Sequence, residues 1–281
     1  MKRTSLCLLF LLAFSLLYAA RDDRQLVILH TNDTHSTIRP ISPLIDDTAT
    51  AGRAGFLRRI ALLEQERAAT PDLLLFDSGD FSQGSFFYNL FKGEVEVELM
   101  NRMHYDAVAL GNHEFDFGVD HLAGLLQRAN FPVVCANYDF GSTPLAAIVK
   151  PYVIVERQGV KVGVFGLSPK ADGLITEENF AGITYLSPVE AARRTIKTLR
   201  EGEKCDVVVC LSHLGWNEKD AEGDQQVFAQ LEGVDLVLGG HSHTYLEELA
   251  YAQDAAGHAV PVDQNGKHAV YVGRIVLHLQ P

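Results

Sequence analysis

The sequence predicts an α/β domain in which short buried strands alternate with amphipathic helices. Seven runs of β-branched and other apolar residues recur along the chain, each short enough to be a strand buried on both faces. Segments with apolar residues at helical spacing lie between these runs, and no internal repeat or Pro/Ser-rich linker interrupts residues 21–281. We therefore expect one domain over 21–281. The predicted strands are 26–29, 73–76, 107–110, 133–135, 160–165, 207–211 and 236–238.

The first twenty residues have the layout of a secretory signal peptide. Lys2 and Arg3 precede an uncharged, leucine-rich stretch that ends in Ala19 and Ala20. A membrane anchor needs about 20 apolar residues, and this run is shorter. We expect cleavage near Ala20 and a working compartment that is secreted, periplasmic or otherwise extracytoplasmic. Because Tyr18 is bulkier than the usual residue at its position, an uncleaved anchor or a cut one residue away stays open as an alternative.

Three helices and a strand-rich end follow from the local patterns. Apolar residues at helical spacing predict helices over 56–63, 122–126 and 189–199, and the last of these begins after Ser187 with Pro188 in its first turn. From Leu246 onward the helical pattern stops. Strand signals then dominate and are separated by glycine turns, which predicts an antiparallel end to the sheet. These signals lie at 251, 260–262, 270–272 and 275–279.

Charge and cysteine content exclude several classes of function. The chain has 24 Lys plus Arg against 36 Asp plus Glu, a formal net charge of −12. A broad basic surface for a nucleic acid polymer or an anionic membrane is therefore not expected, and any phosphate chemistry would need bound cations. After the leader only Cys135, Cys205 and Cys210 remain, and this odd number argues against a disulfide framework.

Five of the predicted strands run directly into small polar clusters. In open α/β sheets the carboxyl ends of the strands form the ligand crevice, so these clusters converge if the strands lie side by side. Together they supply two or three carboxylates, one amide and five imidazoles. The clusters occupy 31–35, 77–80, 111–116, 212–213 and 239–243. The remaining histidines lie outside them and are expected to be structural: His30, His104, His121, His258, His268 and His278.

This ligand set indicates which metals would bind. Imidazole, carboxylate and amide without thiolate suit Zn, Mn, Fe, Co or similar divalent ions, and suit neither Ca²⁺ nor a cysteine-rich zinc site. Even seven of these potential ligands are too many for one tetrahedral ion. Two sites that share a bridging carboxylate, roughly 3.5 to 4 Å apart, would accommodate them all. Such a pair of ions would stabilise both the attacking and the leaving oxygen when a phosphoryl group is displaced.

The five clusters resemble, in order and spacing, the motif blocks of the calcineurin-like metallophosphoesterases. Longer strings around them look like the secreted 5′-nucleotidase and UDP-sugar hydrolase branch of that superfamily, and the resemblance covers about residues 26–279. The blocks are Asp33-Thr34-His35, Gly79-Asp80, Gly111-Asn112-His113-Glu114, Ser212-His213 and Gly240-His241-Ser242-His243.

The resemblance implies a four-layer α/β/β/α sandwich and a role for each motif residue. Asp33, His35 and His243 would hold the first ion, Asn112, His213 and His241 the second, and Asp80 would bridge them. Asn112 and His113 would contact the substrate. His113 would help to neutralise charge in the transition state, and Asp116 would orient it. Glu114 has no assigned role, and Phe115 is expected to pack in the core.

The implied function is a secreted two-metal phosphoesterase that acts on small-molecule phosphate esters, foremost nucleoside 5′-phosphates. The implied mechanism is in-line attack on phosphorus by hydroxide that the two ions activate. A phosphodiesterase or nucleotide pyrophosphatase acting on cyclic nucleotides or nucleotide sugars is the main alternative. A non-catalytic binding subunit and a sulfur-ester hydrolase are further alternatives.

Members of this branch usually continue into a C-terminal domain that stacks the nucleobase, whereas this sequence ends at Pro281. One hypothesis is therefore that a separate partner subunit carries that domain. The alternatives are that loops such as 81–91 and 168–180 select the substrate, or that selection is not narrow. We expect no stable membrane span after removal of the leader.

Overall fold

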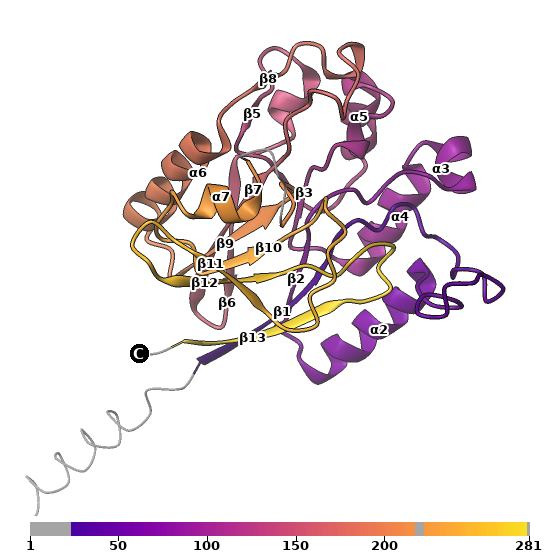
Figure 1. Cartoon of the computed structure of the whole chain (residues 1–281), viewed down its shortest axis with the longest axis horizontal. Helices are drawn as coiled ribbons and strands as arrows, with labels where there is room; N and C mark the ends of the chain where they lie inside the picture. Colours follow the sequence, from indigo (N-terminus) through magenta and orange to yellow (C-terminus); the bar gives the residue numbers. More distant parts are fainter. Residues whose placement is uncertain (1–23, 217–221, 280–281) are drawn as a thin grey trace, which may run out of the picture.

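The computed structural model describes residues 24–216 and 222–279, which form two central sheets covered by helices on their outer faces (Figure 1). The predicted signal peptide at 1–20 lies outside the described residues. The assignment of 21–281 to one domain stays a prediction.

The first sheet has five strands in the order β13-β1-β2-β3-β4. The neighbours from β1 to β4 are parallel, and β13 runs antiparallel to β1 with Ile275 opposite Ile28. Every residue of β2 and β3 is buried, as expected for central strands covered on both faces. The bounds are β1 Arg24–Thr31, β2 Leu74–Asp77, β3 Ala107–Ala109, β4 Val133–Val134 and β13 Gly273–Leu279.

The second sheet has six strands in the order β11-β12-β10-β9-β7-β6. Its four inner strands are parallel, and the edge strands β11 and β6 pair antiparallel to their neighbours. A separate antiparallel pair joins β5 and β8. The bounds are β5 Tyr138–Asp139, β6 Tyr152–Arg157, β7 Val160–Leu167, β8 Thr184–Tyr185, β9 Val207–Ser212, β10 Leu236–Leu238, β11 Ala250–Gln253 and β12 Ala259–Asp263.

Three apolar clusters hold the layers together. One contains inward-facing residues of both sheets, among them Ile28, Phe76, Val164 and Val209, so the two sheets pack face to face. The second joins the first sheet to α2 Phe56–Ala69, α4 Glu94–Met103 and α5 Val119–Leu126. The third joins the second sheet to α6 Pro188–Lys197 and α7 Asp224–Phe228 on the opposite side of the molecule (Figure 1). The predicted α/β/β/α order of layers is therefore confirmed.

Short helices complete the chain between the strands. The helix α3 Phe86–Phe91 precedes α4 and begins at Ser85, whose hydroxyl accepts the N–H of Tyr88. Ser187 caps α6 in the same way, with Pro188 at the first position, as the sequence predicts. The remaining helices are single turns: η1 His113–Phe115, η2 Pro144–Ala147, η3 Glu178–Phe180 and the π-helical η4 Thr198–Gly202.

All seven predicted strands and all three predicted helices are present. The prediction of a strand over 270–272 is wrong, because β13 begins only at Gly273. The antiparallel end is confirmed for β11 with β12 and for β13 with β1, although β12 pairs parallel to β10. Within the described residues, no helix combines the length and the apolar character that crossing a membrane requires.

Candidate metal centre

The five polar clusters meet at one end of the sandwich, and they arrive from both sheets. The segments after β1, β2 and β3 carry Asp33, Asp80 and Asn112 from the first sheet. The segments after β9 and β10 carry His213 and the pair His241 and His243 from the second. The strands thus do not lie side by side in one sheet, yet their carboxyl ends converge as the sequence predicts.

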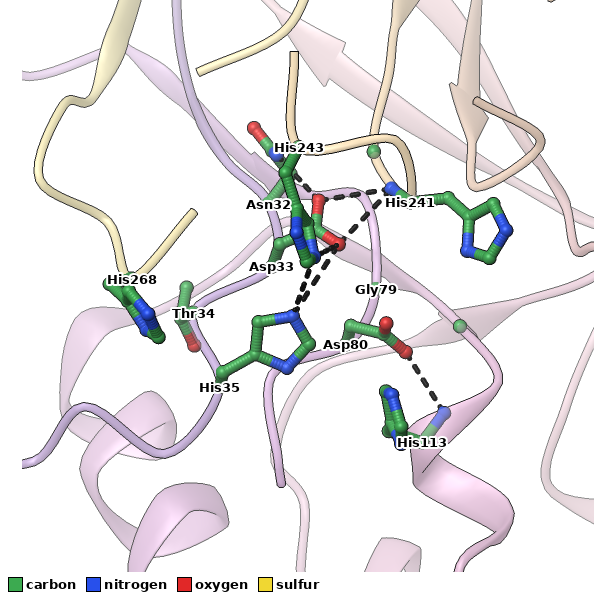
Figure 2. A network of polar contacts seen from close by, with 12 residues as sticks. Asn32, Asp33, Thr34, His35, Gly79, Asp80, His113, His241, His243 and His268 are labelled. Carbon is green, nitrogen blue, oxygen red and sulfur yellow. Dashed lines mark hydrogen bonds and ion pairs between the residues drawn. The ribbon is translucent and has the colours of Figure 1, made fainter. Parts of the chain in front are cut away.

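Asp33, His35 and His243 form one group of potential metal ligands. Each offers a donor atom within 4.8 Å of the others, and Figure 2 shows the three side chains turned toward one another. The Nε2 atoms of His35 and His243 lie 2.9 Å apart, and the Nε2 of His243 lies 3.4 Å from Oδ1 of Asp33. Two donor atoms that bind one ion at about 2.0–2.2 Å are separated from each other by distances like the 2.9 and 3.4 Å found here. This group therefore fits a divalent metal.

Asp80, His213 and His241 form the second group. The Nε2 of His213 lies 3.0 Å from Oδ2 of Asp80, and its Nδ1 donates to the carbonyl of Ser78 at 2.6 Å. That second hydrogen bond fixes the ring so that Nε2 faces the carboxylate, the usual arrangement for a histidine that binds a metal. The Oδ1 of Asn112 is buried beside this group without a hydrogen-bond partner.

The backbone around these side chains adopts conformations that non-glycine residues rarely use. Asp33, His35, Asp80, His241 and His243 all have positive φ, between 41° and 69°. Such conformations carry a cost and persist where the surrounding structure holds them, which is common at functional sites.

Two glycines, Gly79 and Gly111, help the surrounding structure to hold these backbone conformations. A Cβ at Gly111 would lie 2.1 Å from Oδ1 of Asp80, and one at Gly79 would lie 2.5 Å from the Gly111 nitrogen. The two loops approach so closely that only glycine fits at either position. This close approach places Asn112 beside Asp80.

The protonation states favour cation binding. Burial lowers the pKa of both His35 and His241 to about 4, so these imidazoles are neutral, the form that binds metals. Burial alone would also lower the pKa of His213, but the carboxylates of Asp80 and Asp33 outweigh it and raise that pKa well above its ordinary value.

His113, the first residue of the turn η1, and Asp116, which directly follows this turn, lie beside the two groups. Nδ1 of His113 is 3.2 Å from Oδ1 of Asp116, and its side chain is 29% exposed, so the ring is accessible from solvent. Its backbone N–H donates to Oδ1 of Asp80 at 2.9 Å, which fixes the turn to the second group (Figure 2). Burial alone would lower the pKa of His113, but its hydrogen bond to the Asp116 carboxylate and the charges of Asp80, Asp116 and Glu114 together raise it.

Residues 26–245 match the family model described as calcineurin-like phosphoesterase. The chain belongs to the calcineurin-like phosphoesterase family. Proteins of this family use two divalent metals, and the two groups of ligands correspond to two metal positions. The chemistry and spacing of the donor atoms fit such a pair.

Several members of the family are similar to this chain over most of its length. A 5′-nucleotidase of Diplobatis ommata is 33% identical over 263 residues, which are 92% of this chain and 43% of that protein. The human 5′-nucleotidase is 33% identical over 83% of this chain and 40% of its own length. A 5′-nucleotidase precursor from Thermus thermophilus, known from its crystal structure, superposes with a TM-score of 0.81 at 31% identity, over 90% of this chain and 51% of that one. This chain therefore spans about half or less of each of these relatives.

Glu114, to which the sequence analysis assigned no role, proves to connect the two loops of the phosphoesterase site. It is buried, and its carboxylate accepts the backbone N–H groups of Gly111 at 2.7 Å, Asp80 at 3.0 Å and Ser82 at 3.3 Å. Its pKa is raised because it is buried next to the charge of Asp80. The sequence feature that could have revealed this role is the position of an acidic residue between His113 and Phe115, which is fully buried.

His268 is one of the six histidines that the sequence analysis expected to be structural, yet it lies beside the site. Its ring centroid lies 6.0 Å from that of His35, and its backbone N–H donates to the carbonyl of Asp33 at 2.7 Å. Figure 2 shows His268 on the side of His35 away from His113. His30, in contrast, is buried at 2.8 Å from Asp263, in keeping with the structural role expected for it.

Proposed function

We propose that this protein hydrolyses phosphate monoesters, most readily nucleoside 5′-phosphates, at a centre of two divalent metal ions. The observation that carries this proposal is the arrangement of two metal-ligand groups with the His113–Asp116 pair beside them. A binding protein that kept metals only for structure would have no use for an accessible histidine held by a carboxylate next to its metals.

The proposed ligands follow the two groups. Asp33, His35 and His243 would hold one ion, and Asn112, His213 and His241 would hold the other, with Asp80 shared between them. When bound, the ions would supply Lewis-acid chemistry that activates water and offsets the charge of the phosphate. The orphaned buried Oδ1 of Asn112 supports its inclusion, although it lies outside both groups of His and carboxylate donors.

The protein's own groups would orient the ester and stabilise its charge. His113 would donate a hydrogen bond from its accessible ring to a phosphoryl oxygen or to the leaving oxygen, a contribution of about 10²–10⁴ in rate. The Asp116 carboxylate accepts from Nδ1, which would leave Nε2 to face the substrate. The Asp80 carboxylate accepts the backbone N–H of His113 and would thereby hold His113 and Asp116 at a fixed position relative to the metals.

The nucleotide substrate is supported by the relatives. The three relatives described above are 5′-nucleotidases by name, and a further relative, 29% identical over 89% of this chain, is a trifunctional nucleotide phosphoesterase of Bacillus subtilis. A phosphodiesterase or nucleotide pyrophosphatase uses the same centre and is the second candidate.

An extracytoplasmic location is supported by the signal-like pattern of residues 1–20 and by a similar 5′-nucleotidase of snake venom. A separate partner subunit carrying a nucleotide-binding domain remains a prediction, which co-purification would test.

One experiment separates these candidates. The mature chain, purified without chelator, would be assayed for metal by elemental analysis and for phosphate release from 5′-AMP, UDP-glucose and bis-p-nitrophenyl phosphate. About two equivalents of metal with AMP hydrolysis support the nucleotidase, and the activity should disappear in chelator and return with Mn²⁺, Zn²⁺ or Co²⁺. Hydrolysis of the diester alone would favour the second candidate, and no hydrolysis of any ester would contradict the proposal.

A further inference from the structure

The side chain of Asn32, to which the sequence analysis gave no individual role, makes three hydrogen bonds just after β1. It is 1% exposed and directly precedes Asp33. Its Nδ2 donates to Oδ2 of Asp33 at 2.6 Å and to the carbonyl of Gly266 at 2.7 Å. Its Oδ1 accepts the backbone N–H of Asn265 at 2.9 Å. This amide therefore joins a proposed metal ligand to a segment 234 positions later in the chain.

The surroundings of the Asn32 amide fix which of its atoms faces which partner. A flipped amide would place Oδ1 against the Asp33 carboxylate and the Gly266 carbonyl, and both of these groups only accept hydrogen bonds. It would also turn Nδ2 toward a backbone N–H, which only donates. Mismatched polar atoms are costly in a buried site, so the hydrogen-bond network selects the orientation in which Nδ2 donates to Asp33.

The two oxygens of the Asp33 carboxylate have different surroundings. Oδ2 accepts from Asn32, whereas Oδ1 lies 3.4 Å from Nε2 of His243 and 3.8 Å from Nε2 of His35. The backbone N–H of His241 lies 3.1 Å from Oδ1 and 3.0 Å from Oδ2, so it does not distinguish between them. The hydrogen bond from Asn32 does, and it leaves Oδ1 facing the other two members of the first ligand group (Figure 2).

Asn32 is itself held in place by contacts on either side of it in the sequence. The connection between β12 and β13 crosses from the second sheet to the first and passes the end of β1. Before Asn32, Nε2 of His30 lies 2.8 Å from Oδ2 of Asp263. After it, the carbonyl of Asp33 accepts the backbone N–H of His268 at 2.7 Å. Because both neighbours are bound to the same connection, the amide between them has a fixed base from which to orient the carboxylate.

We propose that Asn32 is a positioning residue of the metal centre, which engages Oδ2 of Asp33 and thereby keeps Oδ1 turned toward the first metal position. This inference rests on the proposed function, in which Asp33 is a ligand of the first ion. Removing a hydrogen bond that orients a metal ligand weakens metal binding about 10- to 100-fold. The carboxylate of Asp80 is held separately, by the backbone N–H of His113, so the second position should keep its affinity.

The first test compares two buried asparagines of the same network. Asn32→Ala removes the amide that contacts Asp33, and Asn265→Ala is the matched control. The side chain of Asn265 is also buried, but its Nδ2 lies 2.8 Å from Nε2 of His30, and its backbone N–H remains after the substitution. Chelator-treated protein would be titrated with Mn²⁺ in a calorimeter. Urea unfolding of the metal-free proteins would measure the stability that each substitution removes.

The diagnostic quantity is the difference between the two Mn²⁺ affinities. We expect Asn32→Ala to weaken one of them about 10- to 100-fold and to leave the other close to its wild-type value. Asn265→Ala should bind both ions like the wild type, even where it loses as much stability. Asn32→Ser, which leaves a smaller cavity, should show the same selective loss if Asn32→Ala does not fold. Unchanged affinities, an equal loss at both positions, or the same selective loss in Asn265→Ala would overturn the proposal.

The second test is an EPR measurement with Mn²⁺ and needs no substrate. Two Mn²⁺ ions roughly 3.5 to 4 Å apart couple magnetically and give a spectrum unlike that of isolated ions. Each protein would receive two equivalents, at a concentration between the wild-type and Asn32→Ala dissociation constants of the weakened site. Wild type and Asn265→Ala should give the coupled spectrum, and Asn32→Ala should give it only with excess Mn²⁺.

The same spectra separate failure of this inference from failure of the proposed function. A coupled spectrum from Asn32→Ala at two equivalents would contradict the role of Asn32 and leave the two-metal centre intact. A wild type that never binds two ions would contradict the proposed function, and this inference with it.

Discussion

The carboxylate of Glu114 accepts the backbone N–H of Asp80 at 3.0 Å, across 34 positions of the sequence. The same carboxylate accepts the N–H of Gly111, so it ties the loop that carries Asp80 to the loop that carries Asn112. Two proposed metal ligands on separate strands therefore share one buried anchor.

Glu114→Gln should weaken metal binding about 10- to 100-fold, because an amide group cannot accept all of these N–H donors at once. Metal titration of the chelator-treated protein measures this effect. Glu98→Gln, at a side chain that is 57% exposed and pairs with Arg128, is the matched control and should bind metal like the wild type. Wild-type affinity in Glu114→Gln would show that the anchor is dispensable.

Asp80→Ala should remove metal from both positions and reduce turnover at least about 100-fold, since the shared ligand is lost. Elemental analysis and phosphate release on the same preparation provide the measurement. Circular dichroism would establish that the variant is folded. A folded variant that keeps two equivalents of metal and turns over substrate would show that Asp80 does not bridge.

His113→Asn should leave the metal content unchanged and slow turnover about 10²- to 10⁴-fold, because it removes a donor to the substrate and no metal ligand. The same two assays distinguish the roles. Loss of metal parallel to the loss of turnover would mean that His113 is itself a ligand.

Asp116→Asn should shift the alkaline limb of the pH–rate profile to lower pH. Asp116 is among the groups that raise the pKa of His113, and a protonated His113 loses its function as the pH rises through that pKa. Removing the carboxylate lowers the pKa, so the decline in kcat begins earlier. Profiles of kcat for wild type and variant, recorded at saturating metal, measure the shift, and coincident alkaline limbs would argue against this coupling.

Asp224→Asn should make stability less dependent on pH. Burial raises the pKa of Asp224 to about 7, so the unfolded chain releases this proton near pH 4 and the folded protein only near pH 7. Stability is therefore lost as the pH rises through this window, on the order of 4 kcal/mol for a shift of this size. Asparagine cannot ionise and can still accept from the Ser212 hydroxyl.

Urea unfolding at pH 5 and pH 8 measures the difference between wild type and Asp224→Asn. Asp172→Asn, at a side chain that is 76% exposed, is the control and should follow the wild type. An equal loss of stability in Asp224→Asn and wild type between the two pH values would contradict the assignment.

The sequence predicts the strands well because buried parallel strands are almost purely apolar. It misses β6, whose residues are mostly half-buried at a sheet edge, and α4, where the acidic Glu94 and the buried Glu96 obscure the apolar stripe. The motif residues converge as expected because the carboxyl ends of parallel strands share one end of the molecule. The anchoring role of Glu114 and the position of His268 depend on loop conformations with positive φ, which local propensities do not specify.

The metal ligands come from both sheets, and Asp33 and His243 are 210 positions apart. Neither group of ligands can form from the N-terminal part of the chain alone, because each needs at least one histidine from β9 or β10 and their loops. A complete set of ligands therefore exists only when the two sheets are docked, and metal release should loosen their contact. Uptake of metal during refolding would thus report the moment at which the two halves of this protein join.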